Sequence, residues 1–308
     1  MTEIRPLRIH DLPFVYRVAG LGVNFDAQLS LTVGEDALRH ALMTSMGRMQ
    51  AYILRRSSGS VFGQLHYLES DHHARLANVA PALEDGGDAA LWLELLEGLI
   101  VMAGQRGVVT LIAEVGVNAP EFTVLRRAGF ATYTRQELWV RPPCPVEPPP
   151  AHLHPVATPT GNGLLSLYGS LVPGLIKHVE PPLAASDNHY ILPERRGAAG
   201  MVIVHEGPHA DLIEIYISPQ AETSPYQLVQ AALATVDAER RTVYCRVRDY
   251  MGCPGSALAA AGFQPVATQA AMYRQTAVRV QPRTNDASER VEGGIPLPTS
   301  IVDTPPGY

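Results

Sequence analysis

The chain has 308 residues, of which 46% are hydrophobic and 18% are charged, and its formal net charge is −6 at pH 7. This composition is typical of a globular protein with packed cores, and the length suits about two domains. The acidic balance argues against a nucleic-acid partner, which would favour a basic face. The longest apolar run, from Leu95 to Ala103, is interrupted by Glu97 and Gly98. A membrane span needs about 20 apolar residues, so we expect no membrane partner.

The cysteine pattern predicts neither a disulfide framework nor a metal site. Cys144, Cys245 and Cys253 are odd in number, widely spaced and without a C-x-x-C pair, which indicates a reducing compartment. The adjacent His72 and His73 lack further ligand-type residues at metal spacing. The N-terminus lacks the apolar segment of a signal peptide. We therefore expect a cytoplasmic protein without a bound metal.

Hydrophobic periodicity and turn residues divide the first half into a regular series of elements. Three strands with short connections indicate an antiparallel meander, and a strongly amphipathic helix follows them. The predicted elements are a strand at 4–9, helices from Asp11 and from Gly34, strands at 51–56, 61–69 and 75–81, a helix at 88–105, a strand at 108–115, a helix at 120–128 and a strand at 130–141.

Seven prolines crowd into residues 142–155 and predict a stiff, extended linker. The second half repeats the order in reduced form, with a helix at 163–177, strands at 200–205 and 210–218, a helix at 226–239, a strand at 242–248, a helix at 256–261 and a strand at 266–280. The proline-rich polar end predicts a disordered tail. The predicted organisation is therefore a domain at 1–141, a linker at 142–155, a domain at 156–280 and a tail at 281–308.

A short internal repeat supports this two-domain organisation. The segment Arg127-Ala-Gly-Phe130 is followed by Gln136, and Ala260-Ala-Gly-Phe263 is followed by Gln269. Both copies lie between a predicted helix and a predicted strand. The shared order of elements is stronger evidence for a duplicated fold than the few identical letters.

The order of elements in residues 3–141, with a glycine-containing loop before the long helix and Asn118 before Gly129, resembles the GNAT superfamily of acyl-CoA-dependent N-acyltransferases. Residues 156–280 resemble it more weakly, mainly through the Ala-Gly-Phe263 end. The resemblance implies an α/β (α+β) fold with two tandem GNAT-like domains, each a mixed, mainly antiparallel sheet flanked by helices. The chain would be a tandem GNAT protein with degenerate motifs.

The loop before the long helix is the candidate cofactor site. A glycine loop at a helix N-terminus offers free backbone N–H groups and a favourable dipole to an anion. In the resembled family this loop holds the pyrophosphate of CoA, which implies that acetyl-CoA binds at Val79, Gly86, Gly87, Asp88, Ala89, Ala90 and Asn118. Glu84 and Asp88 would repel a pyrophosphate. The alternative is therefore a capping loop, in which Asp85 or Asp88 satisfies the helix N-terminus.

The candidate catalytic residues are Glu114, Glu69 and Tyr133. The resemblance implies a carboxylate base for the acceptor amine, with Glu69, Asp71 and Glu114 as candidates. Glu114 interrupts an apolar strand, so it is functional, paired with an arginine, or placed at the solvent-exposed end of the strand. The tyrosine that protonates the leaving thiolate in the family is replaced by Leu125. Tyr133 is the nearest substitute, or it packs in a core.

We expect an N-acetyltransferase-like protein that transfers an acetyl group from acetyl-CoA to an amine by direct attack. The amine belongs to a small molecule or to a protein, and a homodimer is a further expected form. The second half has no glycine between Gln220 and Tyr226, so we do not expect it to hold CoA. The alternative is a catalytically inactive GNAT-fold module for binding or assembly.

Overall fold

The computed structural model describes residues 4–34, 48–68, 72–149, 151–156, 162–181, 183–184, 187–195 and 197–276. Two predicted segments lie outside these residues: the helix expected to follow Gly34, and the tail at 281–308. The remaining predicted elements can be compared with the structure directly.

The first half contains seven strands and several helices among its described residues. The strands are β1 (Arg5–Pro6), β2 (Val23–Asn24), β3 (Met49–Arg56), β4 (Gly59–Tyr67), β5 (His73–Ala80), β6 (Thr110–Gly116) and β7 (Ala131–Arg141). The α-helices are α1 (Leu12–Val18), α2 (Ala27–Val33), α4 (Ala89–Gln105) and α5 (Pro120–Arg127), and the short 3-10 helices are η1 (Ile9–Asp11) and η2 (Ala19–Leu21).

The second half follows a similar order. Its strands are β8 (His154–Val156), β9 (Asn188–Glu194), β10 (Gly197–His205), β11 (Asp211–Ile217), β12 (Val243–Arg248) and β13 (Gln264–Gln275). Its helices are α6 (Asn162–Leu171), α7 (Gly174–Val179), α8 (Pro225–Leu233) and α9 (Gly255–Ala260).

The strands form one continuous, mixed and mainly antiparallel sheet. Its order is β1-β3-β4-β5-β6-β13-β7-β12-β11-β10-β9-β8, and β2 pairs with β5 outside this series. Among the described strands, only the β5–β6 and β11–β12 pairs are parallel. The predicted fold class is therefore confirmed, as is the antiparallel meander of β3, β4 and β5.

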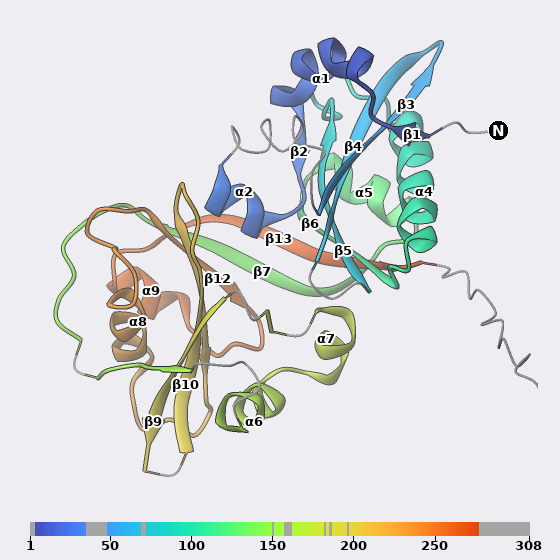
Figure 1. The fold of residues 1–308 in the computed structure, drawn as a ribbon. Helices are drawn as coiled ribbons and strands as arrows, with labels where there is room; N and C mark the ends of the chain where they lie inside the picture. Colours follow the sequence, from blue (N-terminus) through green and yellow to red (C-terminus); the bar gives the residue numbers. More distant parts are fainter. Residues whose placement is uncertain are drawn as a thin grey trace, which may run out of the picture. The chain divides into compact units, whose positions relative to one another are not determined.

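The two halves exchange their last strands. Strand β13, from the end of the second half, lies between β6 and β7 of the first half, and β7 in turn pairs with β12 of the second half. Figure 1 shows β7 and β13 running side by side through the middle of the molecule. The sheet is thus continuous across the proline-rich segment that we predicted as the boundary between domains.

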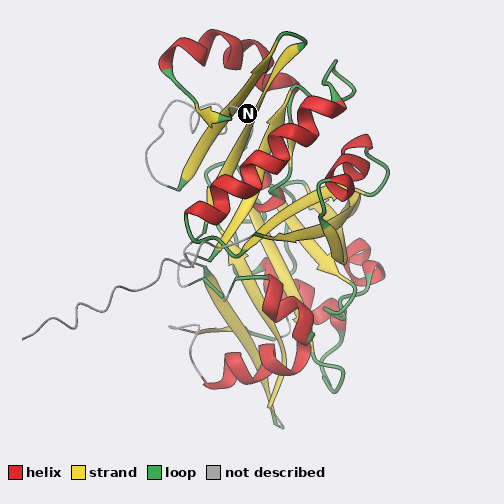
Figure 2. Cartoon of the chain, turned by 90° about the vertical axis from the view of Figure 1, so that its right-hand side faces the viewer, coloured by secondary structure: helices red, strands yellow, loops and turns green. Residues whose placement is uncertain are grey.

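The helices cover the sheet with apolar side chains at helical spacing. In the first half, Leu91, Leu95 and Leu99 of α4 are buried against β4, β5 and β6, together with Leu125 of α5. Figure 2 is viewed from the side on which α4 lies in Figure 1 and shows this long helix across the strands. In the second half, α8 and α9 contribute to a separate buried cluster that includes Leu228.

Three details of the second half differ from the predicted elements. The helix expected at 163–177 is divided into α6 and α7 by Pro173, which has no N–H to continue a helix. The helix expected to reach residue 239 ends at Leu233. Strands β8 and β9 were not predicted, and each contains a proline, Pro155 and Pro193 respectively, which is unusual within a strand.

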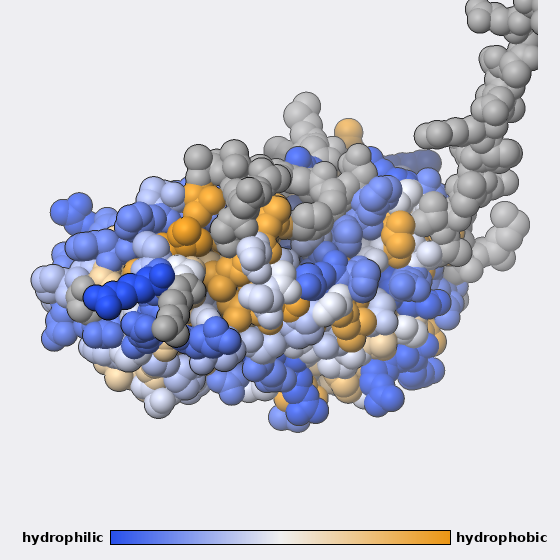
Figure 3. Space-filling model, turned by 90° about the horizontal axis from the view of Figure 1, so that it is seen from below, coloured by the Kyte–Doolittle hydropathy of each residue, from blue (hydrophilic) through white to orange (hydrophobic). Residues whose placement is uncertain are grey.

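None of the described helices is long and apolar enough to cross a membrane. Eight large hydrophobic side chains are exposed in the described chain, and Ile9 is the most exposed, at 86%. Figure 3 shows hydrophobic residues in several separate patches among hydrophilic ones on the face seen from below. Such scattered exposure is normal for a protein surface, and we assign no binding surface to it.

Candidate functional site

Strands β5 and β6 diverge at their carboxyl ends. Their parallel ladder joins His73 to Thr110, Ala74 to Leu111 and Arg75 to Ile112, and both strands continue beyond it for several residues. An opening between the carboxyl ends of parallel strands is a common place for a ligand in α/β proteins. Helix α4 begins close to the end of β5 in sequence, which places a helix N-terminus near the same opening.

The opening is occupied by the chain itself. Strand β2 pairs with β5, with Val23 opposite Val79 and Asn24 opposite Asn78. The next residue bridges both strands: the Phe25 N–H donates to the carbonyl oxygen of Ala77 (2.9 Å), and the carbonyl oxygen of Phe25 accepts from the N–H of Glu114 (2.8 Å). We call residues 23–27 the plug.

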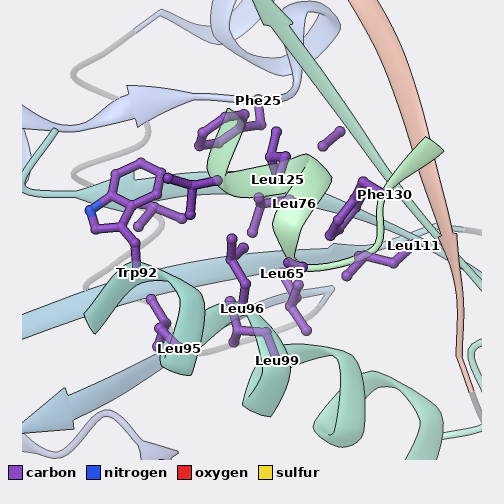
Figure 4. Close-up of a cluster of buried hydrophobic side chains, with 14 of the residues drawn as sticks. Phe25, Leu65, Leu76, Trp92, Leu95, Leu96, Leu99, Leu111, Leu125 and Phe130 are labelled. Carbon is purple, nitrogen blue, oxygen red and sulfur yellow. The ribbon is translucent and has the colours of Figure 1, made fainter. Parts of the chain in front are cut away.

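The side chain of Phe25 fills the space under the helices of the first half. It is 1% exposed and meets the ring of Trp92 edge-on, with 6.0 Å between the ring centroids. Figure 4 shows Phe25 near Trp92 and Leu125, which come from α4 and α5 respectively. The region between these helices is therefore closed by aromatic and aliphatic side chains.

A polar latch fixes the other side of the plug. The carboxylate of Asp26 contacts Nη1 of Arg75 (3.1 Å) and Nδ1 of His66 (3.0 Å), and it accepts from the N–H of Leu29 (3.1 Å) as the cap of α2. Burial raises the pKa of Asp26, but Arg75 and His66 outweigh that effect and hold the pKa well below its usual range. We call Asp26, Arg75 and His66 the latch.

The loop before α4 uses several of its N–H groups internally. Asp88 is the N-cap, and its carboxylate accepts from the N–H of Ala90 (2.7 Å) and of Leu91 (3.3 Å). The Gly87 N–H donates to the carbonyl oxygen of Ala82 (2.8 Å). The capping interaction weighed from the sequence is therefore present, and a pyrophosphate would have to replace the Asp88 carboxylate.

Gly87 is required by the loop's own backbone. A Cβ atom at this position would lie 2.6 Å from the carbonyl oxygen of Ala82 and 2.7 Å from that of Pro81. Gly86 has a left-handed φ of +89°, with no heavy atom within 4 Å of a Cβ position. The glycine pair thus has a structural explanation that does not involve a ligand.

The other predicted binding residues are placed as follows. Val79 is buried beside the plug, whereas Asn118 is exposed in the turn between β6 and α5. Ala89 is the first residue of α4 and is partly exposed. All of them lie near the end of β5, the end of β6 or the start of α4. Their role in binding stays a prediction.

Glu114 is paired with arginine. It is 1% exposed, its Oε1 lies 3.1 Å from Nη1 of Arg246 and 3.7 Å from Nη2 of Arg248, and its Oε2 accepts from the N–H of Ala27 (2.9 Å). The arginine pairing considered from the sequence therefore occurs, with partners from the second half. Glu114 also contacts the plug through its backbone N–H and its side chain, at the point where β5 and β6 diverge.

Tyr133 joins the same buried cluster through Arg248. The Tyr133 hydroxyl donates to Glu180 (2.6 Å), and Nη1 of Arg248 contacts the same carboxylate (2.5 Å). Burial and the adjacent Glu180 raise the pKa of Tyr133 well above its ordinary value. The structure thus links Tyr133 to Glu114 through the Glu180 carboxylate and the Arg248 guanidinium. Glu69 lies outside the described residues.

The sequence did not identify the partners in this cluster. Arg246 also bonds Glu214, whose carboxylate in turn contacts Nε2 of His205 (3.1 Å). The signal available was the placement of Arg246 and Arg248 two residues apart in the strand 242–248, which puts both on one face. That pattern could indicate buried cations, but it could not identify Glu114 as a partner 132 positions away.

The corresponding loop of the second half is also internally bonded. The carboxylate of Glu194 accepts from the N–H of Glu222 (3.1 Å) and of Thr223 (2.7 Å), directly before α8. Ser224 and Gln227 then form a capping box at the start of this helix. A carboxylate of the protein therefore occupies the place where an anion would meet this turn. That this half holds no cofactor stays a prediction.

No protein-family model and no curated protein matches the sequence. Among solved structures, the chain is similar to a GCN5-related N-acetyltransferase from Sphaerobacter thermophilus, with a TM-score of 0.52 and 11% identity over 89% of this chain and 95% of that one. The chain has the GNAT fold. Because this match spans most of both chains, it includes both halves, and the tandem GNAT architecture is confirmed.

Two further solved structures are similar to the chain over most of their length. A putative acetyltransferase from Pyrococcus horikoshii has a TM-score of 0.50 and 10% identity over 91% of this chain and 92% of that one. A tandem GNAT protein from the clavulanic acid biosynthesis pathway has a TM-score of 0.48 and 16% identity over 89% of this chain and 98% of that one. Identities this low describe the GNAT fold and not a substrate.

Proposed function

We propose that the first half of this GNAT-fold chain binds an acyl-CoA, with acetyl-CoA as the expected substrate, and transfers the acyl group to an amine. The observation that carries the proposal is the divergence of β5 and β6 next to the N-terminus of α4. The conformation described here does not accept the thioester, because the plug fills the opening. Binding therefore requires the plug to move away from β5 and β6.

In the open form, the backbone of Ala77 and Val79 would be free to bond the extended arm of the thioester substrate. The N–H groups at residues 86–90 would face its pyrophosphate, as expected at a helix N-terminus. Glu114, released from Ala27, would accept the proton of the attacking amine, and Tyr133 would protonate the departing thiolate. A C–N bond forms and the C–S bond breaks, so the products are an amide and a free thiol.

A second candidate function is a non-catalytic GNAT-fold module for binding or assembly. The observation that favours it is the closed channel, in which Phe25 is 1% exposed against Trp92. In this function the plug is a permanent part of the core.

The two candidates differ in their response to acetyl-CoA. We expect thermal unfolding of the full chain to shift upward with acetyl-CoA, because a ligand at 100 times its Kd stabilises the folded state by about 2.7 kcal/mol. Phe25→Ala should increase the shift, and Phe62→Ala is the matched control, since Phe62 is equally buried but packs with Val15 and Val18 in a different cluster. No shift at millimolar acetyl-CoA in any of these proteins would favour the non-catalytic module.

Activity then requires an acceptor. We expect release of free thiol from acetyl-CoA when the protein is incubated with a panel of small amines and basic peptides. Glu114→Gln should reduce that release while leaving acetyl-CoA binding measurable. Thiol release that is independent of added amine would contradict transfer to an amine.

A further inference from the structure

We propose that the plug, residues 23–27, is a resident competitor of the acyl-CoA substrate and that it opens and closes the site as a unit. This inference rests on the function proposed above and adds to it an intrasteric regulation by the chain's own segment. It also gives the second half a role, because that half contacts α2, the helix that directly follows the plug.

The plug and an extended ligand would use the same backbone groups. Val23 and Asn24 pair with Val79 and Asn78, and Phe25 bonds the carbonyl oxygen of Ala77 and the N–H of Glu114. A backbone N–H or C=O at a strand edge that is already paired is not available to a second strand. Occupation of the opening by the plug and by the substrate is therefore mutually exclusive.

The latch fixes one closed position of the plug but contributes little net free energy to it. The Asp26 carboxylate is 2% exposed and Arg75 is 9% exposed, so both charges lose hydration when the plug closes. In a buried ion pair the cost of that desolvation offsets most of the attraction. Opening uncovers both charges, so Asp26 and Arg75 regain their hydration. The balance is suited to a segment that has one defined closed position and can leave it.

The second half anchors the segment that follows the plug. Within α2, Gln28 contacts Nδ1 of His205 (3.0 Å), and the carbonyl oxygen of Thr32 accepts from the N–H of His209 (2.9 Å). Gly207 lies so close that a Cβ atom there would be 2.3 Å from the same Thr32 oxygen. Movement of the plug therefore requires these contacts between α2 and the second half to adjust.

The closed population sets the apparent affinity for acyl-CoA. The apparent Kd equals the intrinsic Kd divided by the fraction of open molecules, so a protein that is open about 1% of the time binds about 100-fold more weakly than an open one. Substitutions that release the latch should tighten acyl-CoA binding by up to that factor. A covalent bond that holds the plug closed should abolish acyl-CoA binding.

The register of β2 and β5 permits such a bond. Because Phe25 donates to Ala77, the next pair, Asn24 and Asn78, is an antiparallel pair without backbone hydrogen bonds between its two residues. The side-chain Nδ2 of Asn78 donates to Oδ1 of Asn24 (2.8 Å). Antiparallel pairs of this kind have Cα atoms about 4.5 Å apart, within the range of a disulfide. We would make N24C/N78C in a Cys144→Ser background, because Cys245 and Cys253 are buried whereas Cys144 is partly exposed.

The experiment measures acetyl-CoA binding by calorimetry in the full chain. The oxidised N24C/N78C protein should bind at least tenfold more weakly than the same protein after reduction, and Asp26→Asn should bind at least tenfold more tightly than wild type. The Cys144→Ser protein with and without oxidant is the control for the treatment. Equal binding by the oxidised and reduced forms would overturn the plug mechanism and leave the proposed function standing. The proposed function, and this inference with it, would be overturned if acetyl-CoA bound to none of four proteins: wild type, reduced N24C/N78C, Asp26→Asn and Phe25→Ala.

Discussion

Gln136 and Gln269 occupy equivalent positions in the two halves and are bonded to each other. Each lies six residues after the phenylalanine of its Ala-Gly-Phe segment. They are direct partners in the β7–β13 ladder, and Nε2 of Gln136 donates to Oε1 of Gln269 (2.9 Å). A contact between equivalent residues marks the local two-fold axis of a duplicated fold. The internal repeat found in the sequence therefore lies on that axis.

The register around this axis is symmetric. Leu138 pairs with Ala267, and Thr134 pairs with Ala271. Leu138 is equivalent to Ala271, and Thr134 is equivalent to Ala267, so exchange of the two halves converts one pair into the other. Glu114 lies opposite Ala271 and Arg246 lies opposite Leu138, which makes Glu114 and Arg246 equivalent as well. The two equivalent positions thus carry opposite charges, Glu114 and Arg246, which pair with each other across the axis.

The strand exchange predicts that neither half folds well alone. A fragment ending at residue 148 lacks β13, which leaves the apolar residues of β6 without their neighbour and exposes a sheet edge. We expect this fragment and the fragment 149–308 to be aggregation-prone when expressed separately and to form a soluble 1:1 complex when expressed together. Size-exclusion chromatography and circular dichroism would measure this. A monomeric, cooperatively folding 1–148 fragment would contradict the prediction.

The buried Glu114–Arg246 pair predicts a large loss of stability when one partner is removed. Glu114→Gln should destabilise the protein by about 3–5 kcal/mol, because Arg246 and Arg248 lose a buried counter-charge. In a double-mutant cycle with Arg246→Met, the two losses should not add. Urea unfolding measures the coupling. Additive losses would show that the 3.1 Å contact contributes no pairwise energy.

Gly87→Ala should destabilise the protein more than Gly86→Ala. Gly87→Ala forces a Cβ atom to within 2.6 Å of a backbone oxygen, so the loop must shift, and we expect a loss of at least 2 kcal/mol. Gly86→Ala meets no neighbour, and it costs only about 1–2 kcal/mol for a left-handed φ. Thermal unfolding without any ligand measures both. Equal losses would contradict the close approach described for Gly87.

The acidic side chains of the loop should oppose binding of acetyl-CoA. Asp88→Ala removes the cap of α4 at a cost of about 1 kcal/mol, but it also frees the N–H groups of Ala90 and Leu91. We therefore expect lower stability together with an acetyl-CoA affinity that rises several-fold. Asp85→Ala is the control, because Asp85 is exposed and no cap of α4 depends on it. If both variants bind as wild type does, the pyrophosphate does not lie at this loop.

His205 predicts a pH dependence of stability. Burial lowers its pKa, but its contacts with Asp187 and Glu214 outweigh burial, and the pKa is raised above its ordinary value of 6.5. A histidine with a raised pKa contributes stability that is full below pH 6.5 and is lost as the pH rises through the folded pKa.

Comparison of wild type with His205→Gln isolates this effect. Between pH 6 and pH 9, the difference in unfolding free energy between the two proteins should shrink as the pH rises. A difference that stays constant over this range would contradict a protonated His205 in the folded protein.

Local pattern in the sequence determined most of the elements of the first half. Helix α4 follows from apolar residues at a period of 3.6 after the cap Asp88, and β6 follows from a run of β-branched and aliphatic residues. These signals depend only on neighbours along the chain, so they are readable without a structure. The GNAT fold was predicted from their order. For the same reason, the short β2 escaped prediction, because two residues carry no period.

Only the tertiary structure decided what occupies the opening between β5 and β6. The backbone groups of Ala77 and Glu114 are far apart in sequence, and each is satisfied by Phe25. Likewise, Glu114 is buried because Arg246 and Arg248 reach it from the other half of the chain. Pairing and desolvation depend on which atoms are close in space, and a local sequence pattern does not specify contacts between distant parts of the chain. The sequence therefore predicted a cofactor site at the loop before α4 and the end of β5, and the packing of residues 23–27 decided that the opening beside this loop is filled.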